Sequence, residues 1–381
     1  MLTYADIFTG CGGLCHYFYK NTNYSGTLAV DFWPAAAKVF TSNHPNIPFE
    51  LRDMYQPDDV LAVIEALREK CDVLLGGPPC QGFSTLGKRR DDDKRSTLVE
   101  TFLRLSVKVK PKIIVMENVR GIASKEHKTG LPFPEFIRGL LQNEDSPSQY
   151  DIANVLINAL DLGLAQTRVR WILIAVRKDI NENNAVLDKI VNSINSKKVD
   201  RQLSLRDVIG DLPHIESGEG QDIQYIEDNG MKKAIFNHVA MRHSPKLLER
   251  LSYVPVGGGL LDVPQHLLTN HLRKMVQGQY GNGGHIKNIY GRLDWNKPSG
   301  TIVAGIDKIT CGRYVHPDSN RLLTPRECAR IQSFPDDFRF FGSLVNQYYL
   351  IGNAVPPAIS LILSEAIADA LLSNGSIPNF V

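Results

Sequence analysis

The first 178 residues alternate between short apolar runs and amphipathic stretches, and this alternation restricts the possible folds more than any other feature. The runs typical of buried strands lie at residues 3–9, 27–31, 73–75, 113–116 and 171–176. Between them lie stretches with helical periodicity, such as residues 97–109. Strands that alternate with helices form a parallel sheet covered on both faces. The sequence therefore predicts an α/β fold, with ligands at the carboxyl ends of the strands.

The alternation ends near residue 178. Residues 179–300 are rich in Asn, Gly and Pro, contain the run Gly257-Gly258-Gly259, and have no strand–helix period. An apolar helical pattern returns after residue 360, which indicates that the C-terminus folds back onto the first domain. We therefore predict one domain from residues 1–178 and 341–381, and a smaller irregular domain from residues 179–340.

Composition excludes several classes of protein. The chain has 381 residues, of which 43% are hydrophobic and 22% charged, so it can bury a core and is not disordered. A net charge of +2 excludes a histone-like tail protein. Six cysteines without a CxxC pair predict reduced thiols and no structural metal site. No apolar run reaches the ~18 residues of a membrane span, and the N-terminus does not resemble a signal peptide. We expect a soluble, cytoplasmic protein without a membrane partner.

A glycine turn, residues 8–13 (FTGCGG), follows the first predicted strand. Glycines at such a place let a cofactor approach the backbone at a helix N-terminus, although an ordinary tight turn has the same sequence. The dinucleotide fingerprint fails, because Cys15 occupies its third glycine position. Asp31 follows about twenty residues later and is placed to hold ribose hydroxyls. Trp33 could stack on a base, so the sequence favours a cofactor that contains a nucleoside.

A second strand end presents Cys80 after two prolines, Pro78 and Pro79. The prolines stiffen the chain before the thiol. A nucleophilic cysteine must be presented in this way so that its thiolate can reach a target. The alternative is a structural cysteine, which is the usual role of an unpaired one.

Glu117 and two arginines follow other predicted strands. A carboxylate at the end of a buried strand is suited to proton handling, and a surface acid is the alternative. Gln166, Arg168 and Arg170 alternate in a predicted strand, so we expect them to share one face. Two arginines on one face suit the recognition of oxygen or phosphate groups, and a surface row of ion pairs is the alternative.

Residues 229–300 are strongly basic. They contain ten Lys and Arg residues against three Asp and Glu, with five histidines among them. This composition fits either a solvated surface or a face that follows nucleic-acid phosphates. Arg242, Arg273 and Arg292 are the candidates for contacts with guanine bases.

Taken in order, these blocks resemble the DNA (cytosine-5)-methyltransferase family, in its standalone prokaryotic restriction-modification form. The matching blocks are residues 8–13, 31–33, 53, 78–80, 117–119, 166–170, 326–335 (RECARIQSFP) and 352–357 (GNAVPP). They cover both ends of the chain and leave the middle unmatched. The resemblance implies a Rossmann-like sheet that binds S-adenosyl-L-methionine, and a second, smaller target-recognition domain.

The resemblance also implies site residues. Cys80 would attack C6 of a flipped-out cytosine, Glu117 would contact its N3 and N4 edge, and Arg170 would lie near O2 with Arg168 in support. Gln81 and Ser84 would touch DNA. The cofactor would be held by Phe8, Gly10, Gly12, Gly13, Leu14, Asp31, Phe32, Trp33, Asp53, Met54, Pro78, Asn353, Ala354 and Val355. The expected partner is double-stranded DNA, with a cognate restriction endonuclease acting on the same site and the methylase itself a monomer.

Three other functions compete with this interpretation. Some relatives with these blocks methylate tRNA, but they usually carry a Cys-Phe-Thr tripeptide, which this sequence lacks. A catalytically silent DNA-binding regulator would not need Cys80, Glu117 and Arg170 together. An NAD-dependent oxidoreductase is disfavoured by the broken glycine fingerprint.

Overall fold

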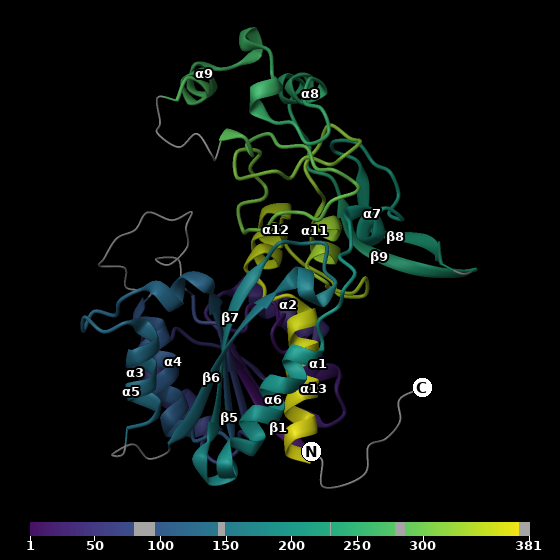
Figure 1. Ribbon diagram of the computed structural model, residues 1–381. Coiled ribbons are helices and arrows are strands. Elements are labelled where there is room, and N and C mark those ends of the chain that lie inside the picture. The colour runs from purple at the N-terminus through teal and green to yellow at the C-terminus, as the bar shows by residue number, and fades with distance from the viewer. Residues whose placement is uncertain (80–95, 144–148, 229, 279–285, 373–381) are drawn as a thin grey trace. The chain divides into compact units, whose positions relative to one another are not determined.

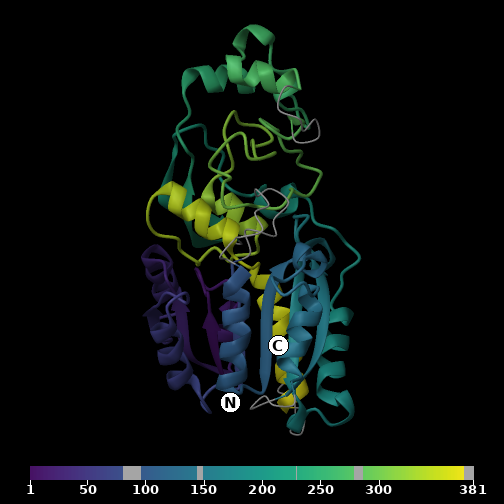
Figure 2. The same ribbon diagram turned by 90° about the vertical axis from the view of Figure 1, so that its left-hand side faces the viewer.

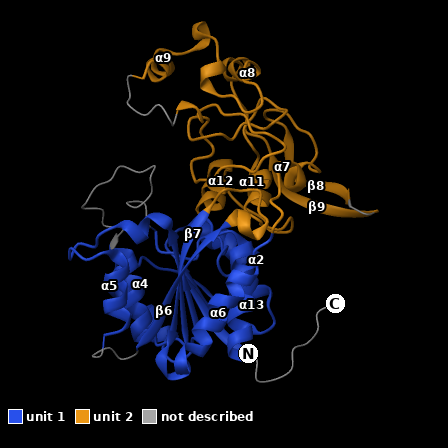
Figure 3. Ribbon diagram, viewed as in Figure 1, with its two compact units in different colours: residues 1–158, 169–199, 354–381 blue, residues 159–168, 200–353 orange. Residues whose placement is uncertain are grey.

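The computed structural model describes residues 1–79, 96–143, 149–228, 230–278 and 286–372. Three predicted site residues, Cys80, Gln81 and Ser84, lie outside the described residues. The chain forms two compact units, shown in different colours in Figure 3. Unit 1 comprises Met1–Asn158, Val169–Val199 and Ala354–Val381, and unit 2 comprises Ala159–Arg168 and Asp200–Asn353.

Unit 1 is built on a seven-stranded sheet with the order β3-β2-β1-β4-β5-β7-β6. Neighbours from β3 to β5 pair in parallel, whereas β7 runs antiparallel to both β5 and β6. The strands are β1 (Leu2–Ile7), β2 (Tyr24–Asp31), β3 (Phe49–Leu51), β4 (Val73–Gly76), β5 (Ile113–Val119), β6 (Tyr150–Asn158) and β7 (Val169–Arg177). The predicted α/β class is therefore confirmed, with one reversed strand that the sequence analysis did not foresee.

Helices cover both faces of this sheet (Figures 1 and 2). One face carries α3 (Pro57–Leu67), α4 (Ser96–Val109) and α5 (Phe133–Leu141), whose apolar side chains form a core with the strands. The other face carries α1 (His16–Lys20), α2 (Pro34–Asn43), α6 (Ala185–Ser196) and α13 (Pro357–Leu372). The central strands are buried on both sides, which is why they read as continuous apolar runs.

The C-terminal helix α13 belongs to unit 1, as its apolar pattern predicted. Ser360 accepts a hydrogen bond from the backbone N–H of Tyr17 in α1 at 3.0 Å. A stretch that includes it, Leu344–Leu372, is long and apolar enough to cross a membrane by length and composition alone. However, Ile359, Leu363 and Ile367 have no exposed surface, so the apolar composition of α13 is that of a core helix.

Unit 2 has little regular structure. Its elements are α7 (Leu205–Ile209), β8 (Gly220–Asp228), β9 (Met231–Val239), α8 (Pro245–Ser252), α9 (Asn270–Val276), α11 (Pro325–Ile331) and α12 (Leu344–Asn353). The strands β8 and β9 form a two-stranded antiparallel sheet. Residues 179–199, which include α6, lie in unit 1, and residues 341–353 lie in unit 2. The boundaries of the two units therefore differ from those of the predicted domains. Residues 179–199 belong to unit 1 because α6 packs on α13.

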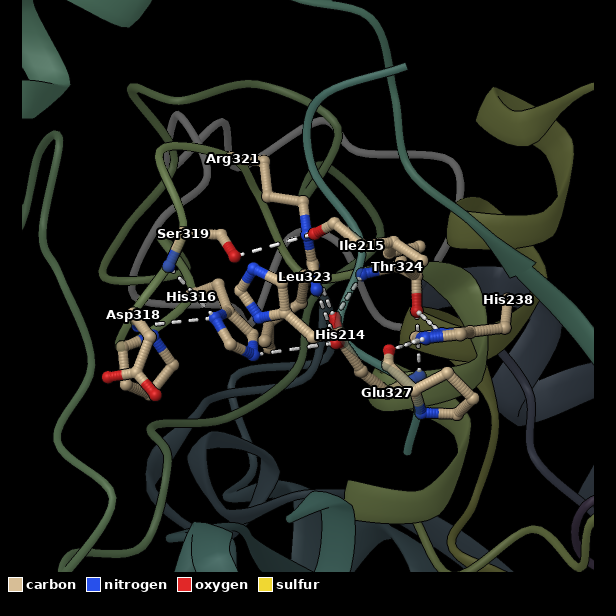
Figure 4. A network of polar contacts seen from close by, with 12 residues as sticks. His214, Ile215, His238, His316, Asp318, Ser319, Arg321, Leu323, Thr324 and Glu327 are labelled. Atoms are coloured by element: carbon tan, nitrogen blue, oxygen red, sulfur yellow. Dashed lines mark hydrogen bonds and ion pairs between the residues drawn. The ribbon is translucent and has the colours of Figure 1, made fainter. Parts of the chain in front are cut away.

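A buried polar network holds unit 2 together (Figure 4). Arg321 forms a bidentate ion pair with Glu327 of α11, with both N–O distances at 2.8 Å. Glu327 also caps its own helix, because its carboxylate accepts a hydrogen bond from the backbone N–H of Thr324. His238 of β9 binds the hydroxyl of Thr324 at 3.0 Å. His316 lies 3.7 Å from the Glu327 carboxylate, so one helix cap joins β9 to the segment from His316 to Glu327.

Candidate active site

The glycine turn follows β1 and is tied to the end of β2 by Asp31. The Asp31 carboxylate accepts hydrogen bonds from the backbone N–H groups of Gly10 and Trp33, both at 2.9 Å. Burial raises the pKa of Asp31, and these N–H groups oppose that shift. The turn is strained, since Phe8 has a φ of +63° although it is not a glycine. Such backbone strain is often found at functional sites.

The aromatic side chain most open to solvent at the end of β2 is Phe32, which is 69% exposed. Trp33, for which the sequence predicted base stacking, is only partly exposed and begins the turn into α2. Asp53 follows β3, and its carboxylate accepts a hydrogen bond from the backbone N–H of Tyr55 at 3.0 Å. These residues lie at the same edge of the sheet, because β1, β2 and β3 are parallel.

Several other predicted cofactor residues are buried in the structure, namely Leu14, Met54, Pro78, Ala354 and Val355. Leu14 is 3% exposed, and Met54 is 4% exposed within the core on the α3–α4–α5 face. Asn353 ends α12 in unit 2, whereas Ala354 and Val355 begin the last segment of unit 1. Buried side chains leave little surface for a ligand, so Leu14 and Met54 would act on a cofactor through their backbones or through packing.

Gly13 allows the glycine turn to approach the segment before α13. A Cβ atom at this position would lie 2.2 Å from the carbonyl oxygen of Val355 and 3.3 Å from the Ala354 side chain. The nearest obstructing atom belongs to the backbone of Val355, so movement of a flexible side chain cannot relieve the contact. The glycine is therefore required by close packing within unit 1 and not only by a cofactor.

We expect Gly13→Ala to reduce the stability of unit 1 by about 1–3 kcal/mol, because the added methyl group forces two backbone segments apart. The measurement is urea unfolding followed by circular dichroism. Gly139→Ala is the matched control, since a Cβ atom at this helical position meets nothing within 4 Å. Equal unfolding midpoints for the two variants would contradict the packing argument.

The sequence analysis missed two contacts behind this turn. Thr9 donates a hydrogen bond to Asp6 of β1 at 2.8 Å, and burial raises the pKa of Asp6 to about 7. His16 and His44 are buried and lie 3.2 Å apart between ring nitrogens, and a Cβ atom on Gly12 would lie 2.6 Å from the His44 ring. The tertiary fold brings His16 and His44 together from positions 28 residues apart, so no local sequence pattern could have indicated that contact.

Glu117 and Arg170 form a short ion pair in unit 1. The Nε atom of Arg170 lies 2.7 Å from Oε1 of Glu117, and each side chain is 12% exposed. The pair follows from the register of β5 and β7, in which Val119 faces Arg170. Oε2 of Glu117 lies near Gly77, 3.7 Å from where a Cβ atom would stand. Asn118 donates to the carbonyl oxygen of Pro78 at 3.4 Å, so the ends of β4 and β5 are linked.

The predicted shared face of Gln166, Arg168 and Arg170 is wrong. Strand β7 begins only at Val169, so alternation along a strand does not apply to the two earlier residues. Gln166 and Arg168 are buried in unit 2 and bind the backbone N–H and carbonyl of Ile302 respectively. Arg168 therefore organises backbone within unit 2, whereas Arg170 pairs with Glu117 in unit 1.

The three arginines predicted to contact DNA differ in how exposed their side chains are. Arg242 and Arg273 are exposed. Arg292 is only 6% exposed, and its guanidinium donates to four backbone carbonyls within 2.9 Å and to the side chain of Asn320. The prediction for Arg292 is wrong, because its donors are occupied inside the protein and cannot reach a base.

Comparison with known proteins identifies the family. The chain is 32% identical to the Type II methyltransferase M.DdeI of Desulfomicrobium norvegicum, over 95% of this chain and 88% of the relative. It is also 32% identical to the Type II methyltransferase M1.HphI of Haemophilus parahaemolyticus, over 97% of this chain and 87% of the relative. Both relatives are matched along nearly their whole length.

Solved structures agree in fold. A chain from an E. coli prophage, assigned as a DNA modification methyltransferase, superposes with a TM-score of 0.71 at 23% identity, covering 97% of this chain and 99% of that one. The Dnmt2 methyltransferase of S. pombe gives a TM-score of 0.61 at 17% identity, covering 98% of this chain and 100% of that one. The methyltransferase fold predicted from the sequence is confirmed. A model of the family described as C-5 cytosine-specific DNA methylase matches residues 2–370, and the chain therefore belongs to that family.

Proposed function

We propose that this chain transfers a methyl group from S-adenosyl-L-methionine to C5 of a cytosine in a specific duplex DNA sequence. It would do so as a standalone, monomeric and cytoplasmic enzyme that protects DNA from a cognate endonuclease. The observation that carries the proposal is the Glu117–Arg170 ion pair, which lies beside the end of β4 in a chain matched by the family model from residue 2 to residue 370. The names of the Type II relatives support the biological role.

The edge of the sheet formed by β1, β2 and β3 fits the proposed cofactor. Each oxygen of Asp31 accepts one backbone N–H, and a carboxylate has further lone pairs for ribose hydroxyls. Phe32 presents an exposed ring on which adenine can stack. The glycines of the turn leave backbone open to the methionine part. When bound, the cofactor supplies an electrophilic methyl group on a sulfonium.

The chemistry requires a nucleophile and an acid. Cytosine C5 is a poor nucleophile because its ring is aromatic. The Cys80 thiolate would form a bond to C6, and negative charge would move toward N3, where Glu117 can donate a hydrogen bond or proton. C5 would then take the methyl group as the methyl–sulfur bond of the sulfonium breaks, and the neutral thioether would leave. Loss of the C5 proton and expulsion of the thiolate restore aromaticity and complete the turnover.

Arg170 fixes which oxygen of Glu117 meets the base. Its Nε engages Oε1 at 2.7 Å, which holds the carboxyl group in one orientation and leaves Oε2 for the substrate. None of the reacting atoms of cytosine is accessible within a stacked duplex, so the base must be flipped out at a cost of a few kcal/mol. Contacts of the basic residues of unit 2 with the DNA backbone would offset that cost.

The test is methyl transfer from labelled S-adenosyl-L-methionine to plasmid DNA and, separately, to tRNA. We expect label in duplex DNA only, and bisulfite sequencing of the product should place it at one cytosine of a recurring sequence. Label in tRNA alone would replace DNA by RNA as the substrate. Specific DNA binding without transfer to either substrate would identify a catalytically silent regulator.

A further inference from the structure

Unit 2 exposes large apolar side chains on a short segment after α8. Tyr253 is 50% exposed, Val256 55% and Leu261 54%, although they lie within nine residues of one another. Their neighbours Val254 and Leu260 are buried in a small core shared by α8 and α9. Single exposed apolar residues are ordinary, but three on one short segment need a reason.

Val256 occupies the corner of a tight turn. The backbone N–H of Gly258 donates to the carbonyl of Pro255 at 2.8 Å, and Gly257 has a φ of +76°. A hydrogen bond from the fourth residue to the first and a positive φ at the third are features of a type II turn, of which Val256 is the second residue. A Cβ atom on Gly258 would lie 2.6 Å from both Pro255 and Asp262, so the glycine run is required by the turn.

Two arginines hold this turn from behind. The carbonyl of Gly258 accepts the backbone N–H of Arg292 at 3.1 Å and the guanidinium of Arg313 at 2.5 Å. The backbone N–H of Gly257 donates a hydrogen bond to the carbonyl of Arg292 at 3.2 Å. Arg313 also donates to that same carbonyl at 3.0 Å, so the turn and the Arg292 backbone form one unit.

The side chain of Arg292 links this turn to the end of α8 and to the loop at residues 316–319. It donates to the carbonyls of Leu251 and Val254 on one side, and of His316 and Ser319 on the other. Burial lowers the pKa of Arg292, which reflects the cost of enclosing the charge. A buried cation that binds backbone carbonyls on two sides fixes the turn in place, so Val256 loses little freedom when it meets a partner.

The surface of the same small core is basic. The exposed cations are Lys246, Arg273, Lys274 and Lys287. Two exposed acidic residues, Glu249 and Asp262, oppose these four cations, and Asp262 accepts the backbone N–H of Gly259 at 2.7 Å. A unit that exposes apolar side chains and more cations than carboxylates complements duplex DNA, whose phosphates are anionic and whose grooves present the apolar methyl group of thymine.

We propose that Val256 contacts base edges in the DNA substrate and contributes to the choice of sequence. The apolar contact has the chemistry with which proteins recognise the methyl group of thymine, and the surrounding cations hold the backbone. The inference rests on the proposed function, and it adds a base-contacting residue to unit 2. Arg292 and Arg313 are positioning residues, since they act through the turn and not on DNA.

The experiment compares Val256→Ser and Val256→Gly, which both remove the methyl groups of the side chain, with the wild type, by kcat/KM on duplex oligonucleotides that carry the methylated sequence or single base-pair changes of it. Both variants should lose roughly tenfold in the preference for the unchanged sequence, as expected when one base contact is removed. The dependence of DNA affinity on salt should keep its slope, because no charge is altered. Cofactor affinity and thermal unfolding should also remain unchanged.

Val199→Ala is the matched control, since Val199 is 46% exposed and lies outside this segment. It should behave like the wild type. An active wild type whose sequence preference survives both Val256 substitutions would overturn the contact and leave the proposed function intact. A wild type that methylates no duplex DNA would overturn the proposed function, and the inference with it.

Discussion

Cys80→Ala is expected to abolish methyl transfer, with a loss of roughly 10⁴-fold or more, because the proposed reaction begins with addition of this thiolate to C6 of the base. Affinity for the cofactor and for DNA should be retained, since the sulfur contributes little to ground-state binding. Transfer of labelled methyl groups measures the first effect, and filter binding with labelled DNA measures the second. A Cys80→Ala protein that still methylates DNA would refute the proposed nucleophile.

Covalent trapping distinguishes a nucleophile from a residue needed only for folding. A duplex with 5-fluorocytosine at the target position blocks the final elimination, so the wild type should remain attached to it in the presence of the cofactor. Cys80→Ala should form no adduct. Cys311→Ala is the matched control, because Cys311 is a partly exposed thiol of unit 2 whose pKa is raised by burial. It should trap DNA like the wild type.

Other cysteines are poor candidates for this step. Burial raises the pKa of Cys11 and of Cys71 to about 12, and it raises that of Cys15 well above its ordinary value. A thiol in such a setting is protonated at neutral pH and does not act as a nucleophile. The three buried cysteines near the sheet are therefore packing residues.

The central strands could be predicted because burial on both faces leaves a mark in the sequence itself. Strand β4 and the first four residues of β5 are continuous apolar segments, and β1 is mostly buried although it contains Asp6; the glycine turn follows β1, and Glu117 follows the apolar residues of β5. The direction of β7 could not be predicted, since the same apolar run fits a parallel or an antiparallel strand. The hairpin β8–β9 was missed because much of β8 and the start of β9 are exposed, and the buried half of β9 includes the polar residues Asn237 and His238, so no clear apolar alternation marks the strands.

The role of a side chain could be predicted only where its position on a strand of the sheet determines what it contacts. Glu117 and Arg170 meet because their strands pair, although the sequence analysis placed Arg170 beside Arg168. Arg292 shows the opposite case. A basic segment contains both surface cations and buried ones, and the carbonyl groups that surround Arg292 come from residues up to 41 positions away in the chain. Composition alone therefore cannot separate a residue that binds DNA from one that organises the recognition unit.

Glu327→Gln is expected to lower the free energy of unfolding of unit 2 by about 3–5 kcal/mol, the usual effect of breaking one side of a buried ion pair. Arg321 is 1% exposed, so the substitution leaves an uncompensated charge in the interior. The amide keeps the shape of the side chain but weakens the hydrogen bonds to Arg321 and Thr324 (Figure 4). Urea unfolding monitored by tryptophan fluorescence measures the effect, since Trp295 lies in this unit.

The matched control is Glu365→Gln, which removes the carboxylate of a surface pair. Its partner Lys197 lies at 2.8 Å, and the two side chains are 43% and 39% exposed. A surface pair contributes at most about 1 kcal/mol, so this variant should unfold almost like the wild type. Equal stability of the two variants would show that the buried pair does not hold unit 2 together.

The stability of the wild type at acid pH should also show the contribution of the ion pair between Glu327 and Arg321. Burial alone would raise the pKa of Glu327, but the charge of Arg321 outweighs it and lowers the pKa from 4.5 to about 2. A depressed carboxyl pKa means that the unfolded state binds the proton first, so the stabilisation is complete above pH 4.5 and is lost as the pH falls toward 2. Burial also lowers the pKa of His316 to about 4, which removes further stability between pH 6.5 and 4. Glu327→Gln should therefore unfold with a shallower dependence on pH below 4.5 than the wild type, and parallel curves would contradict the assignment of the shift to this carboxylate.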